Sequence, residues 1–105
     1  MDERIARQYL PMTETAFYIL FCLRSSQHGY GISQQVKRMT GGEISISAGT
    51  MYGTLSKMER DGLIRMHAEE DKRKLYVITQ AGEELLTAEI RRIERLYKNS
   101  KGETL

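Results

Sequence analysis

Between residues 45 and 64, apolar residues recur at the spacing of an α-helix, with polar residues between them. This pattern predicts the helix around which the chain is organised. One stripe of this helix is apolar and consists of Ala48, Met51, Leu55 and Met58. Ser47 stands before the stripe as an N-cap, because its hydroxyl can accept a backbone N–H of the first turn. Gly62 follows as a C′ residue. The pattern therefore predicts an amphipathic helix between Ser47 and Gly62.

The polar side of this helix has an unusual composition. Its residues are small or hydroxylated except for one cation: Gly49, Thr50, Gly53, Thr54 and Lys57. An ordinary exposed face carries Glu, Lys and Gln, since Gly and Thr are poor helix formers. Small residues suit a recognition helix that another large molecule approaches closely. They also suit a helix that packs tightly against a second helix of the same domain, and this stretch alone leaves both interpretations open.

The segment from 14 to 26 is apolar nearly all round, which predicts a helix buried on most of its faces. In so short a chain, full burial of this helix requires a second subunit. Thr13 offers its N-cap, and Pro11 separates it from residues 1–12, an N-terminal arm or short helix. A Gly- and Ser-rich turn at 26–31 follows.

A second helix is predicted after that turn, ending at the two glycines at 41 and 42. Its inward-facing residues are expected to be Ile32, Val36 and Met39. After Gly62, residues 63–68 and 75–79 read as two strands of a β-hairpin around a charged tip at 69–74, although no Asn-Gly pair fixes the turn type. Three helices followed by a hairpin is the order of a winged helix, a helix-turn-helix with a hairpin attached.

The last segment begins with Thr79 as a cap and continues with an apolar seam at helical spacing: Leu86, Ile90, Ile93 and Tyr97. Charges such as Glu89 flank the seam. Two heptads are too few for an independent coiled coil, so we expect the seam to pack on the N-terminal helix of a partner, at Phe17 and Phe21. The predicted fold is mainly α with a small β-hairpin. It comprises a winged-helix domain over 1–80 and a C-terminal dimerisation helix with a frayed tail over 81–105.

Composition narrows the class of protein. A chain of 105 residues has room for one domain, and its net charge of +2 is too small to diagnose a nucleic-acid partner. Its single cysteine, Cys22, cannot form an internal disulfide, which fits a reducing cytosol and predicts a cytoplasmic protein. No apolar run approaches the ~20 residues that span a bilayer, and no signal-peptide core is present at the N-terminus.

Catalytic chemistry is poorly represented. His28 and His67 lack a partner at a spacing that would set metal geometry. Cys22 lies in an apolar helix, as a small buried hydrophobe does. The neighbouring carboxylates Glu69 and Glu70 fall on a hairpin tip, where their pKa values are hard to tune. We therefore expect no enzyme activity, no metal and no cofactor.

Several short motifs occur together in a specific order. They are Thr13-Glu14, the run 19–23, His28-Gly29-Tyr30, Ser47 with Gly49-Thr50-Met51-Tyr52, Glu59, Gly62-Leu63-Ile64, Tyr76, Ile78-Thr79 and Gly82. In this order the chain resembles PadR-like transcriptional regulators over roughly residues 10–86. The resemblance implies a winged-helix dimer that represses bacterial promoters, in the short-tailed branch with a single C-terminal dimerisation helix. Two departures are Ala48, where many members have Pro, and the acidic wing tip.

Double-stranded DNA is accordingly the expected partner, bound by a homodimer at an inverted repeat. Hydroxyls near the start of the organising helix and one cation further along form the first set of candidates: Ser47, Thr50, Tyr52, Thr54 and Lys57. Lys57 can reach a guanine edge or a phosphate. The wing contributes Lys72, Arg73 and Lys74, unless they are only a solvated hairpin tip. Tyr30 is a further candidate, although a core tyrosine is the preferred interpretation there.

Two other functions remain open. Some winged helices dock proteins with the same helix, and the near-neutral charge suits that alternative, a protein-interaction module without DNA binding. A small aromatic or lipophilic effector is a third candidate partner, as in many PadR-like dimers. Tyr9, Phe17, Phe21 and Tyr97 can line its pocket, or they can simply fill the dimer core.

Overall fold

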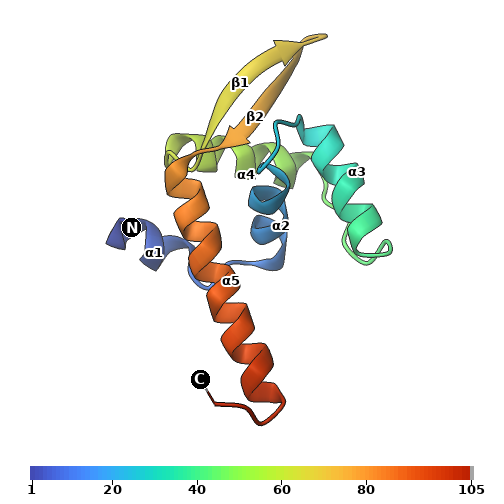
Figure 1. The fold of residues 1–105 in the computed structure, drawn as a ribbon. Helices are drawn as coiled ribbons and strands as arrows, with labels where there is room; N and C mark the ends of the chain where they lie inside the picture. The colour runs from blue at the N-terminus through green and yellow to red at the C-terminus, as the bar shows by residue number, and fades with distance from the viewer. Residues whose placement is uncertain (105) are drawn as a thin grey trace.

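The computed structural model describes residues 1–104, and the predicted tail residue Leu105 lies outside this range. Five helices and one hairpin occur in the described chain (Figure 1): α1 (Glu3–Tyr9), α2 (Glu14–Cys22), α3 (Gly29–Met39), α4 (Ala48–Arg60), β1 (Ile64–Glu70), β2 (Arg73–Ile78) and α5 (Gln80–Ser100). The two strands are antiparallel. The predicted class, mainly α with a small β-hairpin in winged-helix order, is confirmed.

Three helices begin where the sequence places their caps. The side chains of Thr13, Ser47 and Thr79 each accept a backbone N–H from the first turn of α2, α4 and α5. The start of α3 was predicted wrongly, because Gly29 begins the helix inside the expected turn. The N-cap is His28, whose ring accepts the Gly31 N–H. Imidazole is not among the common N-cap groups, so the pattern did not reveal this start.

The core lies between α2, α3, α4 and the beginning of α5, and the base of the hairpin closes it. The apolar stripe of α4 is buried at Met51, Leu55 and Met58, as predicted. Ala48 was expected in this stripe but is exposed; it is the first residue of α4, and burial begins at Met51. Met39 was also expected to face inward and is exposed instead, since it is the last residue of α3, where the chain leaves toward the glycine turn.

The hairpin turn is shorter than the sequence suggested. Only Asp71 and Lys72 form it, with φ values of 51° and 66°, which is the pattern of a type I′ turn. Glu69 and Glu70 therefore belong to β1 and stand directly opposite Lys74 and Arg73 of β2. Opposite charges at cross-strand positions favour pairing, and they extend both strands into the predicted tip.

The beginning of α5 is fastened to the turn after α4. Thr79 donates its backbone N–H to the Leu63 carbonyl at 3.0 Å and its hydroxyl to the Gly62 carbonyl at 2.6 Å. A Cβ added at Gly82 would lie 2.2 Å from the Leu63 oxygen. Leu86, expected in the dimer seam, is only 4% exposed because it packs in the core of its own chain. The prediction that Leu86 packs mainly against a partner subunit is wrong.

Glu89 was expected among the exposed charges that flank the seam, yet it is 1% exposed. Its carboxylate accepts two hydrogen bonds from the Arg92 guanidinium, at 2.6 and 2.9 Å, and one from the Met12 N–H at 3.2 Å. A buried carboxylate needs such partners, because its removal from water is otherwise costly. Glu89 thus ties α5 to the connection between α1 and α2.

A second polar contact holds α1 against the end of α4. The Tyr9 hydroxyl donates to Asp61 at 2.7 Å, and the Lys57 ammonium donates to the same carboxylate oxygen at 3.0 Å. The Tyr9 hydrogen bond and then the Lys57 contact hold the pKa of Asp61 below its usual range. Burial and the bond to Asp61 raise the pKa of Tyr9 above its usual range. Both shifts keep this contact intact at neutral pH.

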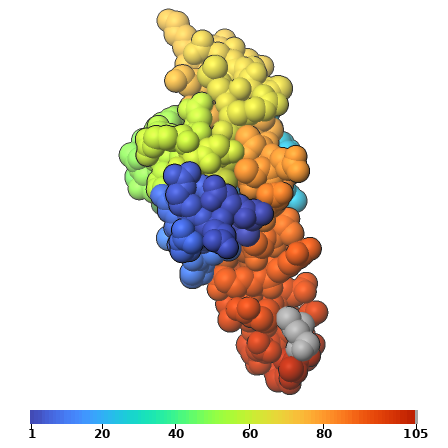
Figure 2. All heavy atoms as spheres, turned by 90° about the vertical axis from the view of Figure 1, so that its left-hand side faces the viewer, coloured from blue at the N-terminus to red at the C-terminus, as the bar shows by residue number. Residues whose placement is uncertain are grey.

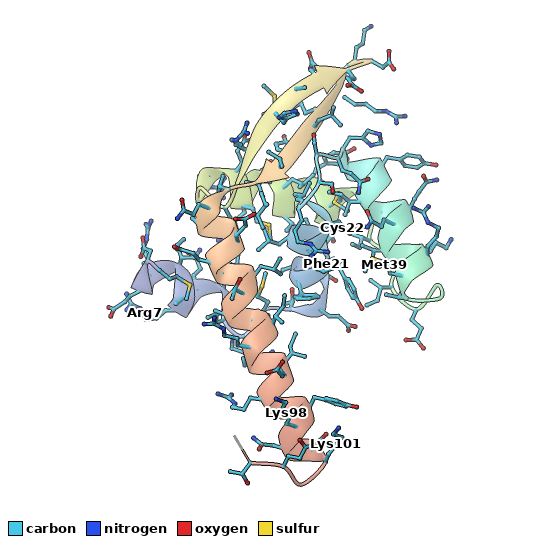
Figure 3. All side chains as sticks on the ribbon, viewed as in Figure 1. Arg7, Phe21, Cys22, Met39, Lys98 and Lys101 are labelled. Atoms are coloured by element: carbon cyan, nitrogen blue, oxygen red, sulfur yellow. The ribbon has the colours of Figure 1, made fainter. Side chains whose placement is uncertain are left out.

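The molecule is elongated, with principal extents of 50 × 33 × 21 Å. Figure 2 shows the hairpin at one end and the C-terminal part of α5 at the other. Lys98 lies on the part of α5 that extends away from the body, and Lys101 follows directly after its end (Figure 3). None of the described helices combines the length and apolarity that crossing a bilayer demands.

The close contact at Gly82 predicts a large effect of one methyl group. Gly82→Ala should lower the free energy of unfolding by about 1–3 kcal/mol, the range for overpacking, because a backbone carbonyl cannot swing aside as a side chain can. Urea denaturation should show a lower midpoint with an unchanged m-value. Gly53→Ala is the matched control, since nothing lies within 4 Å of a Cβ there. It should raise stability by up to about 1 kcal/mol. Equal midpoints for Gly82→Ala and the unaltered chain would contradict this account.

Candidate nucleic-acid interface

The outer face of α4 is open. A Cβ added at Gly49 or Gly53 would meet no atom within 4 Å, so no neighbouring helix of the domain packs on these glycines. The interpretation of the small residues as a helix-packing surface is therefore wrong. Ser56 and Arg60 are exposed and lie on the same face, at spacings of three and four after Gly53. The sequence analysis missed both residues, although continuing the spacing would have found them.

The hydroxyl candidates near the start of α4 differ in what they can do. Ser47 is occupied as the cap, accepting the Thr50 N–H at 3.2 Å and donating to the Thr50 hydroxyl at 3.0 Å. Thr50 is exposed, whereas Thr54 is half-buried. Tyr52 is exposed, and its ring lies against the first turn of α3. A Cβ at Gly29 would come within 3.0 Å of that ring, so Gly29 is what lets Tyr52 approach α3.

Lys57 does not point outward from the open face. Its ammonium is held by Asp61 and lies 4.8 Å from the centre of the Tyr9 ring. Asp61 follows Lys57 by only four residues, a helical spacing that the sequence analysis did not use. Tyr9 lies 48 positions before Lys57, so spacing does not reveal its ring as a neighbour. The position of Lys57 is at the edge of the face, beside α1.

Tyr30 is 54% exposed, so the preferred interpretation as a core tyrosine is wrong. Its hydroxyl accepts a hydrogen bond from Gln34 at 2.9 Å. The His28 ring stacks beside it, with centroids 6.4 Å apart and planes 16° apart. The guanidinium of Arg73 lies 5.5 Å from the Tyr30 ring centre. The start of α3 and the wing therefore share one surface, and His28 was not among the sequence candidates.

The basic residues of the wing occupy different positions. Lys72 lies in the turn, whereas Arg73 and Lys74 are in β2 opposite Glu70 and Glu69. Neighbouring strand residues point to opposite faces, yet Arg73 and Lys74 both border the groove beside the wing. The wing and α4 enclose an open groove of about 340 Å³. Its lining is His28, Gly29, Tyr52, Ser56, Glu69, Lys72, Arg73, Lys74 and Tyr76.

The apolar candidates lie apart from this surface. Phe17 and Phe21 are half-buried on α2 and stacked with their centroids 5.9 Å apart. Ile90 and Ile93 are exposed on α5, and Tyr97 is 62% exposed.

The four effector candidates do not converge in one chain. Tyr9 is buried against α4, Tyr97 lies on the projecting part of α5, and only Phe17 lines the hollow between α2 and α5. The predicted pocket lies between two subunits, so its lining by these four residues stays a prediction.

Chemical groups suited to catalysis remain dispersed. Cys22 is buried, and its burial raises the pKa of the thiol. Across residues 1–104, no group of three His, Cys, Asp or Glu side chains is arranged to hold a metal ion.

The comparisons with known proteins point to one family. The sequence model of the transcriptional regulator PadR-like family matches residues 19–88. The transcriptional regulator YqjI of Escherichia coli K12 is 27% identical over 78 residues, which cover 74% of this chain and 38% of that protein. The chain spans between 19% and 38% of the length of the curated relatives that it matches.

Solved structures share the fold. A transcriptional regulator from Clostridium thermocellum superimposes with a TM-score of 0.70 at 26% identity, over 94% of this chain and 95% of that chain. Bacillus subtilis PadR, solved in complex with operator DNA, has a TM-score of 0.61 at 27% identity. That match covers 72% of this chain and 47% of the Bacillus protein.

Proposed function

The chain belongs to the PadR-like family of transcriptional regulators, and we propose that it binds an inverted-repeat operator as a homodimer and represses transcription. Members of this family are regulators rather than enzymes, in agreement with the expectation from the sequence. The observation that carries the proposal is the open face of α4, where Gly49 and Gly53 have empty space above them. A large, rigid partner such as a duplex can approach that face closely. The complex of the Bacillus relative with operator DNA supports the same partner.

In this proposal α4 enters the major groove, as recognition helices do. Thr50, Ser56 and Arg60 lie on the approaching face, and Arg60 can read a guanine edge or bind a phosphate. Lys57 takes part only after its ammonium leaves Asp61. Tyr30 and Tyr52 border the face, while Ser47 acts through the helix start that it caps. Lys72, Arg73 and Lys74 bind phosphates, which add affinity without sequence preference.

In this proposal the C-terminal part of α5 forms the homodimer interface. Leu85, Leu86 and Glu89 pack on the body of their own chain, whereas the apolar residues beyond them are exposed: Ile90, Ile93, Leu96 and Tyr97. This part of the helix projects from the domain (Figure 1). A helix with an uncovered apolar face is stabilised by a partner, and Phe17 and Phe21 of a second subunit are suited to cover it. We accordingly place the boundary between the DNA-binding and dimerisation regions near residue 89, within α5.

An effector, in this proposal, is a small aromatic or lipophilic molecule that binds between the subunits. One chain alone does not bring the candidate aromatic residues together, so both subunits must contribute. Phe17 borders a hollow that Arg92 and Ile93 also line, and this hollow lies beside the surface that the partner covers.

The alternative function is docking of a protein on the same α4 face. The tip of the wing is locally balanced in charge, and a protein partner tolerates such a surface. The two alternatives differ in their salt dependence. Affinity for DNA falls steeply as the salt concentration rises, because Lys and Arg side chains that bind phosphates displace counterions from the DNA. The affinity of a docked protein need not depend on salt in this way.

Selection from random DNA tests the proposed function. The purified full chain should enrich an inverted repeat whose half-sites are separated by about one helical turn, roughly 10 bp, because two-fold symmetry presents two copies of α4. Sequencing of the bound fraction provides the measurement. If no inverted repeat is enriched and no DNA is retained above background, the result would favour the protein-docking alternative.

Gly53→Ala should separate stability from DNA binding. The added methyl stabilises α4 by up to about 1 kcal/mol. It should nevertheless weaken operator binding by about 1–3 kcal/mol, the range for overpacking a close contact. Thermal melting and equilibrium DNA titration measure the two effects. Thr87→Ala, at an exposed position of α5, is the control and should leave DNA affinity unchanged. An unchanged affinity for Gly53→Ala would mean that DNA does not approach this face.

Charge placed on the exposed face of α5 should separate the subunits. The double variant Ile93→Glu with Tyr97→Glu should be a folded monomer by light scattering, because two carboxylates would be buried without partners. Arg95→Glu is the control, since Arg95 is exposed on the opposite side of the helix. This control should remain a dimer. A double variant that stays dimeric would place the interface elsewhere.

A further inference from the structure

His28 has one ring nitrogen committed inside its own chain. Nδ1 accepts the backbone N–H of Gly31 at 3.0 Å, which caps α3. A backbone N–H can only donate, so Nδ1 must present its lone pair to it. In neutral imidazole the single proton is then on Nε2, and Nε2 is a donor.

Nε2 faces another donor. It lies 3.5 Å from Nη1 of Arg73, and a guanidinium carries five N–H donors and no acceptor. The two groups come from α3 and the wing, 45 residues apart in the sequence. A donor beside a donor satisfies neither group, so the pair is suited to an acceptor that both can reach.

The surroundings favour an external, anionic acceptor. Lys72 and Lys74 line the same groove, together with the carboxylate of Glu69. Glu69 stands opposite Lys74 in the strand register and Glu70 stands opposite Arg73. Of the ion pairs found within residues 1–104, none includes Arg73. The His28 ring is also held in place, since Tyr30 stacks beside it.

We propose that His28 Nε2–H and the Arg73 guanidinium together bind one DNA backbone phosphate, and that His28 does so as a neutral donor. This phosphate clamp, defined as His28 and Arg73, links the helix-turn-helix to the wing. It rests on the proposed function, because it requires that the chain bind DNA. It adds a contact residue, His28, and assigns different physical roles to the two members of the clamp.

The two roles separate in their response to salt. A cation that neutralises a phosphate releases counterions, and each such contact adds about 0.9 to the slope of log affinity against log salt. A neutral N–H donor forms a hydrogen bond but releases no counterion. Loss of His28 should therefore weaken binding without altering the slope, whereas loss of Arg73 should weaken binding and make the slope shallower by about one.

His28→Asn is the variant that isolates the phosphate contact. Asn is among the preferred N-cap residues, so its side-chain oxygen can accept the Gly31 N–H, while the shorter side chain cannot reach Arg73. Binding to a mixed-sequence duplex would be titrated between roughly 50 and 200 mM salt. We expect the affinity to fall roughly tenfold to a hundredfold, the range for one hydrogen bond to a charged acceptor, with unchanged slope and unchanged melting temperature.

Arg73→Gln is the matched comparison and should change the slope. The double variant should lose less affinity than the product of the two single losses, because both residues bind the same phosphate. Wild-type affinity in His28→Asn, a slope change in that variant, or fully independent losses would each overturn the clamp. If the unaltered chain fails to bind any duplex, the proposed function itself fails, and that result is distinct from the other three.

A measurement on the unaltered protein covers the case in which His28→Asn melts early. Nitrogen-15 NMR of the imidazole at about pH 8, above the ordinary imidazole pKa range, should show the Nε2–H tautomer in the free protein. Addition of the duplex should shift the Nε2 resonance and preserve the tautomer. A proton on Nδ1, or an Nε2 resonance that DNA leaves unchanged, would overturn the proposal.

Discussion

The carbonyl group of Leu63 is the point on which the arrangement of the molecule depends. It follows the turn that ends α4 and comes one residue before β1, and its oxygen accepts the N–H of Thr79 at the start of α5. Gly82 passes so close to this oxygen that a methyl group would collide with it. The end of α4, the wing and the start of α5 are therefore positioned around one backbone atom. None of the three can shift far without disturbing the others.

Two polar contacts extend this arrangement to the N-terminal part of the chain. Glu89 binds the N–H of Met12, and Tyr9 binds Asp61, so the segment from α1 to α2 is held against both α5 and α4. Both acceptors are carboxylates whose partners come from more than fifty residues away in the sequence. Since α5 is one continuous helix, the helix that completes the core also carries the exposed apolar residues from which we propose the dimer interface.

Local signals explain what could be predicted from the sequence. The caps of α2, α4 and α5, the buried stripe of α4 and the hairpin all depend on residues a few positions apart, and all were found. Glu89 was placed wrongly because its partner Met12 is 77 positions away, a separation that periodicity does not reveal. The Tyr9 ring that faces Lys57 is likewise 48 positions away, but its ion-pair partner Asp61 is only four residues away and could have been predicted from helical spacing. Tyr30 was misplaced because the cap that starts α3 is an imidazole. The spacing that identified Gly49 and Gly53 also predicts Ser56 and Arg60 on the same face. They were missed because the sequence analysis selected small and hydroxylated residues near the start of the helix and did not continue the spacing to its end.

The cross-strand pairing in the wing bears on the kinetics of association. Residues 69–74 contain three carboxylates and three cations, and Glu69 and Glu70 stand directly opposite Lys74 and Arg73. Beyond the Debye length of ~8 Å, the fields of these opposite charges largely cancel. In the proposed complex with DNA, the wing therefore does little to steer a distant duplex toward the protein, and its cations act only on contact. The wing should then contribute little to the dependence of the association rate on ionic strength. Salt should weaken the contacts of the wing mainly by shortening the lifetime of the proposed complex.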